Sequence, residues 1–363
     1  MWKWIIIAVG LAMPAVAQDR LQTLQGPVII ETIARGLDTP WAVAPLPDGS
    51  FLITDRDGVL LMGLPGEGIT RIAGVPKVWT QGQGGLLDVV AARDFASTQE
   101  IFMTYSAPGD GGAATAVAVA KLDAGAKTLR GVTEIFRMNA HSPKARHFGS
   151  RVVEATDGTL FVTIGDRADA ARAQSLDVHN GKVIRINRDG SVPEDNPFVS
   201  GPTPEVWSLG HRNAQGAALD LRGQLWIVEH GAAGGDEVNQ PMAGKNYGWP
   251  VISYGRHYSG GKIGEGTSKP GMEQPMHYWD PSIAPSGMMI YSGKLWPDWR
   301  GDIFVGSLKF DYISRLEAGA NAGETEQLFR DRFIRIRDIR EAPDGTIWFL
   351  AVGDGALYRM RPS

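Results

Sequence analysis

Short apolar runs separated by polar turn residues dominate the chain. Runs of Val, Ile, Leu, Phe and Trp end in Gly, Asp, Asn or Pro, which is the pattern of β-strands rather than of amphipathic helices. Only residues 168–176 suggest a short helix. Asp-Gly pairs stand between several of these runs, and such pairs favour tight hairpins. The pattern therefore predicts an all-β protein.

One hairpin pattern recurs along the chain: a strand, a tight turn, a second apolar strand and a polar end. Its clear copies are WAVAPLPDGSFLITDRDG, SRVVEATDGTLFVTIGDR, NAQGAALDLRGQLWIVEHG, IYSGKLWPDWRGDIFVGSLK and IREAPDGTIWFLAVGDG, and a looser sixth copy is GLLDVVAARDFASTQEIFMTYS. Six copies between residues 28 and 360 give roughly 55 residues each, which suits a four-stranded blade. We predict a six-bladed β-propeller of four-stranded antiparallel blades, with a β-sandwich or a pair of barrels as the alternative.

Ring closure and the N-terminus complete this prediction. Residues 28–33 are expected to form the outer strand of the last blade, because that strand would satisfy an otherwise open edge. Before them, Lys3, the apolar residues 4–13 and the small residues at 15–17 have the pattern of a secretory signal peptide. The alternative, a membrane anchor, needs roughly 20 apolar residues. We expect a signal peptide over residues 1–17, one propeller domain over residues 18–363, a periplasmic location and no membrane span.

The net charge and the absence of cysteine exclude several classes of ligand and of catalytic group. The chain has 36 Lys and Arg against 40 Asp and Glu, a formal net charge of −4, which argues against a nucleic-acid binder with a basic surface. It has no cysteine, so disulfides, cysteine-ligated zinc, iron–sulfur clusters and thiol nucleophiles are excluded. The chemistry must use oxygen and nitrogen groups or a bound cofactor.

The repeat predicts where functional side chains gather. Residues at the same phase of each blade, next to the innermost hairpin, meet at one mouth of the central channel. Counted from the hairpin turns, this phase contains Gln83, His147, Arg212, Asn213, Lys309, Arg335 and Arg337. The four cations among them predict an anionic ligand with carboxylate or phosphate groups. Alternatively, each Arg pairs with a neighbouring acid, as Arg337 could with Asp338.

His147 is the candidate proton acceptor of this mouth, because imidazole titrates near neutral pH. It stands beside Arg146 and Phe148, and nearby cations would keep it neutral. The phase argument does not separate it from His211, which precedes Arg212.

A glycine-rich stretch at residues 229–250, EHGAAGGDEVNQPMAGKNYGWP, carries adjacent acids at Asp236 and Glu237. Flexible, oxygen-rich loops of this kind suit Ca²⁺, which takes six to eight oxygen ligands. The alternative is an ordinary loop between blades with solvated carboxylates.

Several motifs together resemble one family. They are GLDTPWAVAPLPDG, GQGGLLD, HFGSR with IGDR, SLGHRNAQG, EHGAAGGDEVN with KNYGWP, SIAPSG, SLK and RIRDI. In this order they resemble soluble aldose sugar dehydrogenases that depend on pyrroloquinoline quinone (PQQ), relatives of the soluble quinoprotein glucose dehydrogenase. The resemblance covers residues 36–360.

The resemblance implies roles for individual residues. His147 matches the catalytic base, Gln83 lines the cofactor and sugar pocket, and Arg212, Asn213 and Lys309 match contacts of the quinone oxygens. Arg335 and Arg337 match the pair that holds PQQ carboxylates, with Ser282 at a small hydroxyl position. The carbonyls of Gly231 and Ala232 match ligands of a PQQ-bound Ca²⁺, and Glu237 with the Tyr247 carbonyl matches a second, structural Ca²⁺ site.

The implied reaction is oxidation of the anomeric C1 hydroxyl of an aldose to a lactone. His147 would remove the hydroxyl proton, a hydride would pass to PQQ, and Arg212 with Ca²⁺ would stabilise the developing negative charge. Electrons would pass to an external acceptor, a dye, quinone or cytochrome, and the resemblance to shorter members favours a monomer. The alternatives are a Ca²⁺-dependent lactonase and a non-catalytic propeller that binds a sugar or a protein.

Three positions depart from the family pattern. Arg146 stands where the glucose enzyme has an acid, Ala232 replaces a proline, and Asp280 replaces an aromatic residue before Pro281. These departures leave cofactor binding as the expectation and leave the preferred sugar open.

Overall fold

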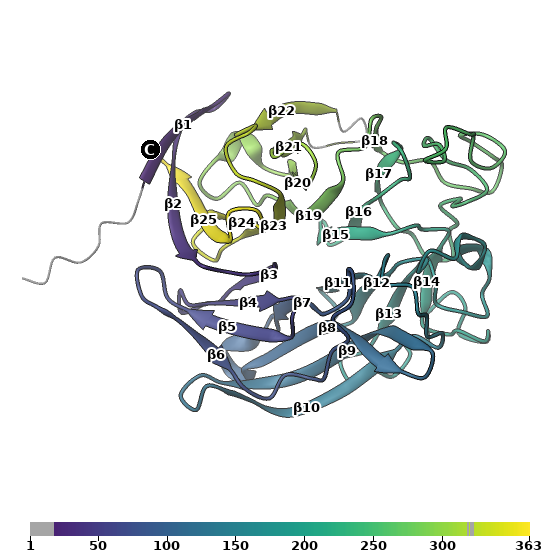
Figure 1. Cartoon of the computed structure of the whole chain (residues 1–363), viewed down its shortest axis with the longest axis horizontal. Helices are drawn as coiled ribbons and strands as arrows, with labels where there is room; N and C mark the ends of the chain where they lie inside the picture. Colours follow the sequence, from purple (N-terminus) through teal and green to yellow (C-terminus); the bar gives the residue numbers. More distant parts are fainter. Residues whose placement is uncertain (1–17, 318, 320–322) are drawn as a thin grey trace, which may run out of the picture.

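The computed structural model describes residues 18–317, 319 and 323–363, and its strands form six antiparallel blades around a central channel (Figure 1). Five sheets have four strands and the sixth has five. The predicted six-bladed propeller is therefore confirmed. The predicted signal peptide, residues 1–17, lies outside the described residues.

Blades are numbered here from the first complete four-stranded sheet of the chain. Blade 1 contains β3 (Pro40–Pro45), β4 (Phe51–Asp55), β5 (Val59–Gly63) and β6 (Ile69–Ile72). Blade 2 contains β7 (Leu86–Ala91), β8 (Glu100–Gly109), β9 (Gly112–Asp123) and β10 (Thr128–Arg137). Blade 3 contains β11 (Gly149–Glu154), β12 (Leu160–Ile164), β13 (Lys182–Ile186) and β14 (Val206–Leu209).

Blade 4 contains β15 (Ala214–Leu219), β16 (Leu225–Glu229), β17 (Asp236–Asn239) and β18 (His277–Trp279). Blade 5 contains β19 (Pro285–Ile290), β20 (Ile303–Ser307), β21 (Ile313–Leu316) and β22 (Glu324–Leu328). Blade 6 contains β23 (Ile336–Glu341), β24 (Ile347–Ala351), β25 (Ala356–Pro362), β2 (Gly26–Arg35) and β1 (Gln18–Thr23).

The recurring sequence pattern corresponds to the two innermost strands of each blade. In three of the hairpins the turn aspartate, Asp48, Asp157 or Asp344, accepts at Oδ1 both the N–H and the hydroxyl of the residue two positions later. This local bonding holds the turn independently of the rest of the fold. In blade 2 the short helix α1 (Phe95–Thr98) replaces the tight turn, which explains why that copy looks looser.

The core lies between neighbouring blades, where the faces of the sheets meet. The inner strands are covered on both faces, so β4 and β12 are buried at every position. Double-sided burial explains why these strands read as continuous apolar runs rather than as an alternation. Aromatic rings join adjacent blades, as where Phe51 of blade 1 meets Trp348 of blade 6 at 5.6 Å between ring centroids.

The ring closes through β2, which pairs with β25 as predicted for residues 28–33. Glu31 of β2 accepts hydrogen bonds from Arg359 and Arg361 of β25. The prediction that this strand is outermost is wrong, because β1 pairs with its free edge over six residues. The β1 sequence, QDRLQT, is mostly polar and exposed, so it lacks the apolar signal on which the strand prediction depended.

Buried charges join the inner strands across the middle of the channel. Arg151 of β11 lies 3.2 Å from Asp88 of β7 and 2.9 Å from Asp338 of β23. Arg340 of β23 contacts the same two acids at 2.6 and 3.1 Å. Both acids are fully buried. The network ties three blades together, because each arginine contacts both acids.

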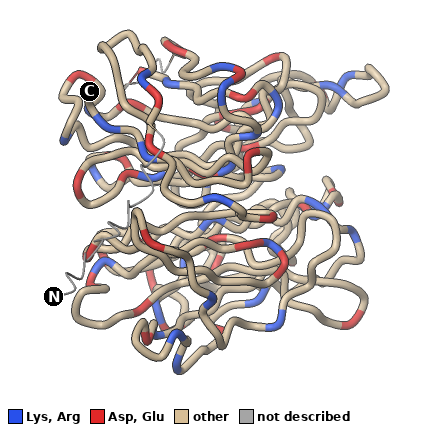
Figure 2. Tube along the Cα trace, turned by 60° about the vertical axis from the view of Figure 1, so that its left-hand side comes forward, with Lys and Arg blue, Asp and Glu red and all other residues tan. Residues whose placement is uncertain are grey.

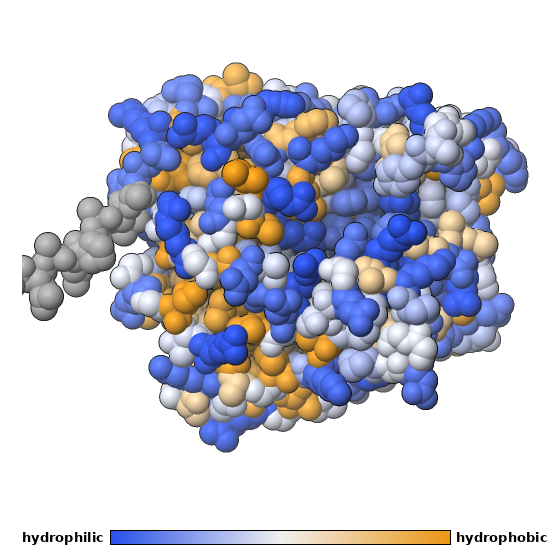
Figure 3. Space-filling model, viewed as in Figure 1, coloured by the Kyte–Doolittle hydropathy of each residue, from blue (hydrophilic) through white to orange (hydrophobic). Residues whose placement is uncertain are grey.

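The remaining elements are two 3₁₀ helices, η1 (Ala170–Gln174) and η2 (Pro297–Trp299). The helix expected over residues 168–176 is therefore shorter and tighter than predicted. Within the described ranges, no helix has the length and apolar character needed to cross a bilayer. Charges of both signs are spread over the blades (Figure 2), and a hollow bordered by hydrophilic residues lies near the centre of the ring (Figure 3).

Candidate active site

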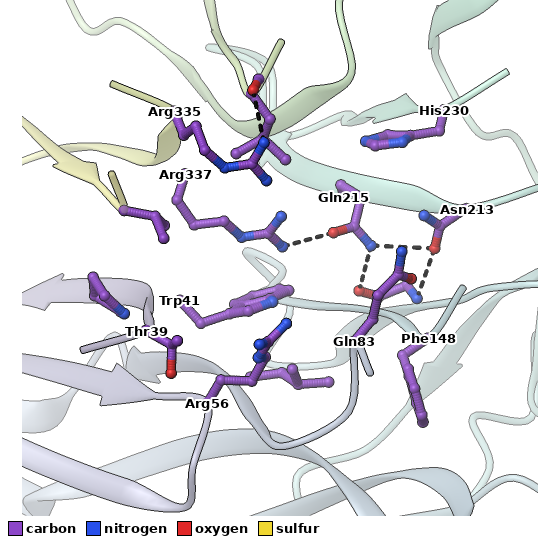
Figure 4. Close-up of a pocket in the computed structure, with 15 residues that line it drawn as sticks. Thr39, Trp41, Arg56, Gln83, Phe148, Asn213, Gln215, His230, Arg335 and Arg337 are labelled. Carbon is purple, nitrogen blue, oxygen red and sulfur yellow. Dashed lines mark hydrogen bonds between the residues drawn. The ribbon is translucent and has the colours of Figure 1, made fainter. Parts of the chain in front are cut away.

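A polar cavity of about 220 Å³ lies at the end of the channel where the loops that precede the inner strands meet. Figure 4 shows its labelled side chains converging from several blades. The cavity is lined by Thr39, Pro40, Trp41, Arg56, Gln83, Leu87, Phe148, Gly149, Asn213, Gln215, His230, Leu308, Arg335, Arg337 and Val352. The predicted residues Gln83, Asn213, Arg335 and Arg337 are thus brought together.

Positive charge without a matching acid is the main electrostatic feature of this cavity. Arg337 is 8% exposed, and its guanidinium lies 4.3 Å from the Trp41 ring centroid. Its Nη2 donates to Gln215 Oε1 at 2.6 Å, whereas its Nε and the Nε of Arg56 have no partner among the described residues. Burial, and then the charge of Arg151, lower the pKa of Arg337 well below its ordinary value. Burying a charged guanidinium without an opposing acid is energetically unfavourable, so its presence here implies an anionic ligand.

The alternative pairing of Arg337 with Asp338 is not what the structure shows. Arg337 is the unpaired residue at a register shift of β23 between Ile336 and Asp338, and the Asp338 carboxylate contacts Arg151 and Arg340 instead. Arg335 donates from Nη1 to the carbonyl of Leu308 at 3.1 Å, not to an acid.

His147 precedes Phe148, which lines the cavity, and β11 begins two residues after it, but His147 is not itself among the lining residues. Its Nδ1 lies 2.7 Å from Oδ1 of Asp166, and its backbone N–H donates to Gln83 Oε1 at 2.7 Å. Its φ of 57° is unusual for a residue with a side chain. A Cβ at Gly165 would lie 2.0 Å from the His147 carbonyl oxygen, so the strained loop also requires glycine beside it.

The protonation of this pair follows from its surroundings. Burial, and then the charges of Arg212 and Arg146, lower the pKa of His147 against the opposing effect of Asp166. Burial alone would raise the pKa of Asp166, but the hydrogen bond from His147 and nearby positive charge lower it overall. The neutral imidazole therefore faces a carboxylate with Nδ1, so Nδ1 carries the proton and Nε2 is an acceptor. The expected neutrality of His147 has burial as its largest cause, ahead of the neighbouring cations.

His211, the competing histidine, is engaged at both ring nitrogens. Nε2 lies 2.8 Å from Ser208 Oγ and Nδ1 lies 2.9 Å from Glu229 Oε1. It is 1% exposed. This geometry gives it a structural role and separates it from His147.

Arg212 lines a second, smaller cavity, whereas the next residue, Asn213, lines the main one. Its Nη1 donates to the His230 carbonyl at 3.2 Å, and its guanidinium lies 5.2 Å from the Trp249 ring centroid. The smaller cavity is lined by Gly210, Arg212, Glu229, His230, Gly231, Gly235, Glu237, Tyr247, Trp249, Ile252 and Ser253. His230 lines both cavities, so the predicted cofactor residues and most predicted Ca²⁺ residues are neighbours.

Two acids, the buried Glu229 and the partly buried Glu237, meet in this smaller cavity. Asn239 Nδ2 donates to both Glu229 Oε1 and Glu237 Oε2 at 3.0 Å, while its own Oδ1 has no partner among the described residues. Burial, and then the charge of Glu229, raise the pKa of Glu237 to about 8. Adjacent carboxylates and an unsatisfied amide oxygen fit a divalent cation, with backbone carbonyls such as that of Tyr247 completing an oxygen shell. Among the described residues no three acidic or histidine side chains gather as a ready-made metal site.

Besides His147 and Arg212, two more predicted residues are not among those that line the main cavity, Ser282 and Lys309. Ser282 Oγ donates to Asp236 Oδ2 at 2.7 Å, which fixes the loop before β19. Lys309 follows the wall residue Leu308, and its Nζ lies 4.8 Å from the Phe310 ring centroid. Neither side chain is among those that border the cavity.

Residues 37–359 match the Glucose / Sorbosone dehydrogenase family. The chain belongs to the glucose/sorbosone dehydrogenase family. It is 42% identical over 345 residues to the aldose sugar dehydrogenase YliI of Escherichia coli K12, with 92% of this chain and 93% of the relative covered. It is 26% identical over 406 residues to quinoprotein glucose dehydrogenase B of Acinetobacter calcoaceticus, with 88% and 84% covered.

Solved structures of the glucose/sorbosone dehydrogenase family agree with this fold. The apo form of the soluble aldose sugar dehydrogenase of Escherichia coli superimposes with a TM-score of 0.89 at 40% identity, covering 93% of this chain and 100% of that one. The PQQ-bound aldose sugar dehydrogenase of Streptomyces coelicolor gives 0.77 at 25% identity, covering 96% and 99%. The family resemblance predicted from the motifs is thereby confirmed.

Several site residues of this family member were not predicted from the sequence. Trp41, Arg56, Gln215 and His230 line the main cavity, and Asp166 holds His147. Gln215 lies at a register shift of β15 between Ala214 and Gly216, where the regular alternation of a strand gives no signal. Asp166 ends the second strand of its hairpin, a repeat phase that could have paired it with His147.

Proposed function

We propose that this chain is a PQQ- and Ca²⁺-dependent aldose dehydrogenase, which oxidises the anomeric C1 hydroxyl of a sugar to a lactone. The observation that carries the proposal is the buried, acid-free guanidinium of Arg337 on the wall of a cavity that it shares with Arg56 and Arg335. The aldose sugar dehydrogenase relatives, one of them PQQ-bound, support the same reading.

The residues present fit PQQ. It is a planar tricarboxylate, and the three arginines that line the cavity, two of them with an unpartnered Nε, suit carboxylate groups. When bound, PQQ would supply a quinone that accepts a hydride from the sugar. Arg335 and Arg337 would hold its carboxylates, and Gln83, Arg212, Asn213, Ser282 and Lys309 would complete the cofactor environment.

Two Ca²⁺ ions complete the proposed cofactor set. The carbonyls of Gly231 and Ala232 would bind one beside PQQ, where Ca²⁺ would act as a Lewis acid. Glu237 and the Tyr247 carbonyl would bind the second, a structural ion that neutralises the two acids described above.

His147 is the proposed base of the reaction. The Asp166 carboxylate keeps the imidazole proton on Nδ1, so Nε2 can accept the proton of the sugar hydroxyl. Arg212, a permanent cation stacked on Trp249, would stabilise negative charge that develops at the reacting centre. The proton removed by His147 would return to solvent, because the ring is 13% exposed.

The proposal also covers the location of the protein, its oligomeric state and its electron acceptor. We infer that residues 1–17 direct export to the periplasm and are removed, that the mature chain is a monomer, and that electrons leave through an external dye, quinone or cytochrome. The periplasm would make aldoses and soluble acceptors available to the same protein.

The experiment is a reconstitution titration of purified cofactor-free protein. PQQ with Ca²⁺ is added, a panel of aldoses is supplied, and reduction of an electron-accepting dye is followed. We expect activity that saturates with PQQ and disappears with a chelator. Binding of PQQ without oxidation of any aldose would move the substrate outside simple sugars. Absence of PQQ binding would overturn the proposal, and a parallel lactone-hydrolysis assay without PQQ would then test the lactonase.

A further inference from the structure

Trp249 contacts the proposed base and the proposed charge-stabilising arginine through one side chain. Its indole Nε1–H donates to Asp166 Oδ2 at 2.9 Å across 83 residues of sequence. Its ring centroid lies 5.2 Å from the Arg212 guanidinium. Because Asp166 Oδ1 lies 2.7 Å from His147 Nδ1, the order of contacts is His147, Asp166, Trp249 and Arg212.

The backbone of Trp249 is fixed on both sides. Its N–H donates to the Gly210 carbonyl at 2.9 Å, and its own carbonyl accepts from Gln174 Nε2 at 2.7 Å. Gly210 is two residues before Arg212, and Gln174 ends η1. The indole is therefore held against blade 3 and against the loop that carries Arg212, rather than only by its own long connection between β17 and β18.

The chemistry of the indole N–H is specific. Indole nitrogen only donates, so it favours an ionised Asp166 with no proton at Oδ2. Oδ1 also accepts the backbone N–H of Ala168 at 2.7 Å, and the Asp166 side chain is 2% exposed. With donors at both oxygens, the carboxylate can meet His147 only as an acceptor, which leaves the imidazole proton on Nδ1.

We propose that Trp249 is a positioning residue for the reaction: its N–H fixes Asp166 and hence the Nδ1–H tautomer of His147, while its ring supports Arg212. This inference rests on the proposed function, because it takes His147 as the base. The side chain of Trp249 would thus have two separable roles. Its N–H acts on the base, His147, through Asp166, and its ring face contacts the cation, Arg212.

Separate variants test the two parts. Trp249→Phe removes the N–H and keeps an aromatic ring, whereas Trp249→Leu removes both. Trp226→Phe is the matched control, because its indole N–H also donates to a carboxylate, Asp220 Oδ2 at 3.3 Å, at a hairpin turn of blade 4. Melting temperatures of the three variants show whether each one folds.

The first readout is the ring ¹⁵N spectrum of His147 in the mature chain at pH 8, with ¹⁵N-labelled histidine and with His147→Asn to assign the signals. We expect Trp249→Phe to shift His147 from the Nδ1–H tautomer toward a mixture and to lower kcat/KM about tenfold, with PQQ affinity unchanged. Trp249→Leu should also weaken PQQ binding. Trp226→Phe should alter none of these quantities.

A double-mutant cycle with Asp166→Asn tests whether Trp249 acts through Asp166. We expect Trp249→Phe to have little further effect on kcat/KM once Asp166 is replaced. An unchanged His147 spectrum in Trp249→Phe, or fully additive losses in the cycle, would overturn the inference. If the wild-type protein oxidises no aldose, the proposed function fails, whereas the spectra still decide whether Trp249 sets the tautomer.

Discussion

Nδ1 of His147 and Oδ1 of Asp166 lie 2.7 Å apart, at the open end of one hairpin. His147 precedes β11 and Asp166 follows β12, and the register pairs Gly149 with Ile164. The innermost hairpin of blade 3 therefore places the imidazole and the carboxylate next to each other. Because Asp166 is almost wholly buried and His147 is partly exposed, the fixed carboxylate can hold the orientation of the more accessible imidazole.

This pairing predicts how the two side chains differ in function. His147→Ala should retain PQQ and lose turnover by roughly 10²–10⁴-fold, the usual contribution of a positioned base. Asp166→Asn should keep PQQ affinity and lower kcat, because an amide cannot hold Nδ1–H as a carboxylate does. Steady-state kinetics and PQQ titration measure both effects. Asp169→Asn, which removes the partner of Arg172, is the control, and normal turnover of His147→Ala would contradict the assignment.

The lowered pKa of His147 predicts the pH profile. The base must be neutral, so kcat/KM should fall on acidification with a midpoint below the ordinary histidine value of 6.5. Arg146 contributes to this lowering. Arg146→Asp should stabilise the imidazolium, raise the pKa of His147 and move the acidic limb to higher pH. Arg222→Asp, at a distant turn, should leave the limb in place, and an unshifted limb in Arg146→Asp would contradict the electrostatic argument.

The blade architecture is predictable from the sequence because its main signal is local. Asp48 and Asp157 hold their turns by accepting hydrogen bonds from residues two positions away. Each hairpin can therefore be recognised from a stretch of about 18 residues. By contrast, β1 has no comparable signal. Its pairing depends on the free edge of β2, which exists only once the ring has closed.

The site is predictable only where the repeat phase decides the position. Arg337 and Asn213 share that phase and share the cavity. Trp249 reaches Asp166 from the long connection after β17, and no periodic pattern describes the path of that loop. Ser282 is the opposite case. Its sequence motif pointed to a place in the cofactor site, but in the structure its hydroxyl donates a hydrogen bond to Asp236.

The neighbouring acids of blade 4 predict a stabilising effect of Ca²⁺. One amide bridges Glu229 and Glu237, and the charge of Glu229 raises the pKa of Glu237, so a divalent ion should relieve the repulsion between the two acids. Ca²⁺ should raise the melting temperature of the cofactor-free protein, and a chelator should reverse the effect. Glu237→Gln should abolish this response. The exposed Glu194→Gln should retain it, and a response of Glu237→Gln equal to wild type would place the ion elsewhere.

Ring closure predicts a pH-dependent contribution of Glu31. Burial would raise its pKa, but hydrogen bonds from Arg361 and Arg359 lower it overall. A lowered carboxyl pKa means that the stabilisation is complete above 4.5 and is lost as pH falls through the folded-state value. Glu31→Gln should lower the free energy of unfolding at pH 7 by roughly 1–3 kcal/mol, and the difference should shrink in acid. Denaturant unfolding at several pH values measures it, and a constant difference would contradict the linkage.

Two arginines of β23 should respond in opposite ways to the same substitution. Arg340 contacts Asp88 and Asp338, so Arg340→Met should leave buried acids short of a partner and destabilise the protein by roughly 3–5 kcal/mol. Arg337 forms no ion pair with an acid in the described part of the chain, so Arg337→Met should raise the melting temperature of the cofactor-free protein by removing a buried, uncompensated charge. The same change should weaken PQQ binding about 10–100-fold. Thermal unfolding with and without PQQ measures both effects, and destabilisation by Arg337→Met without loss of PQQ affinity would mean that this cation serves the fold rather than the ligand.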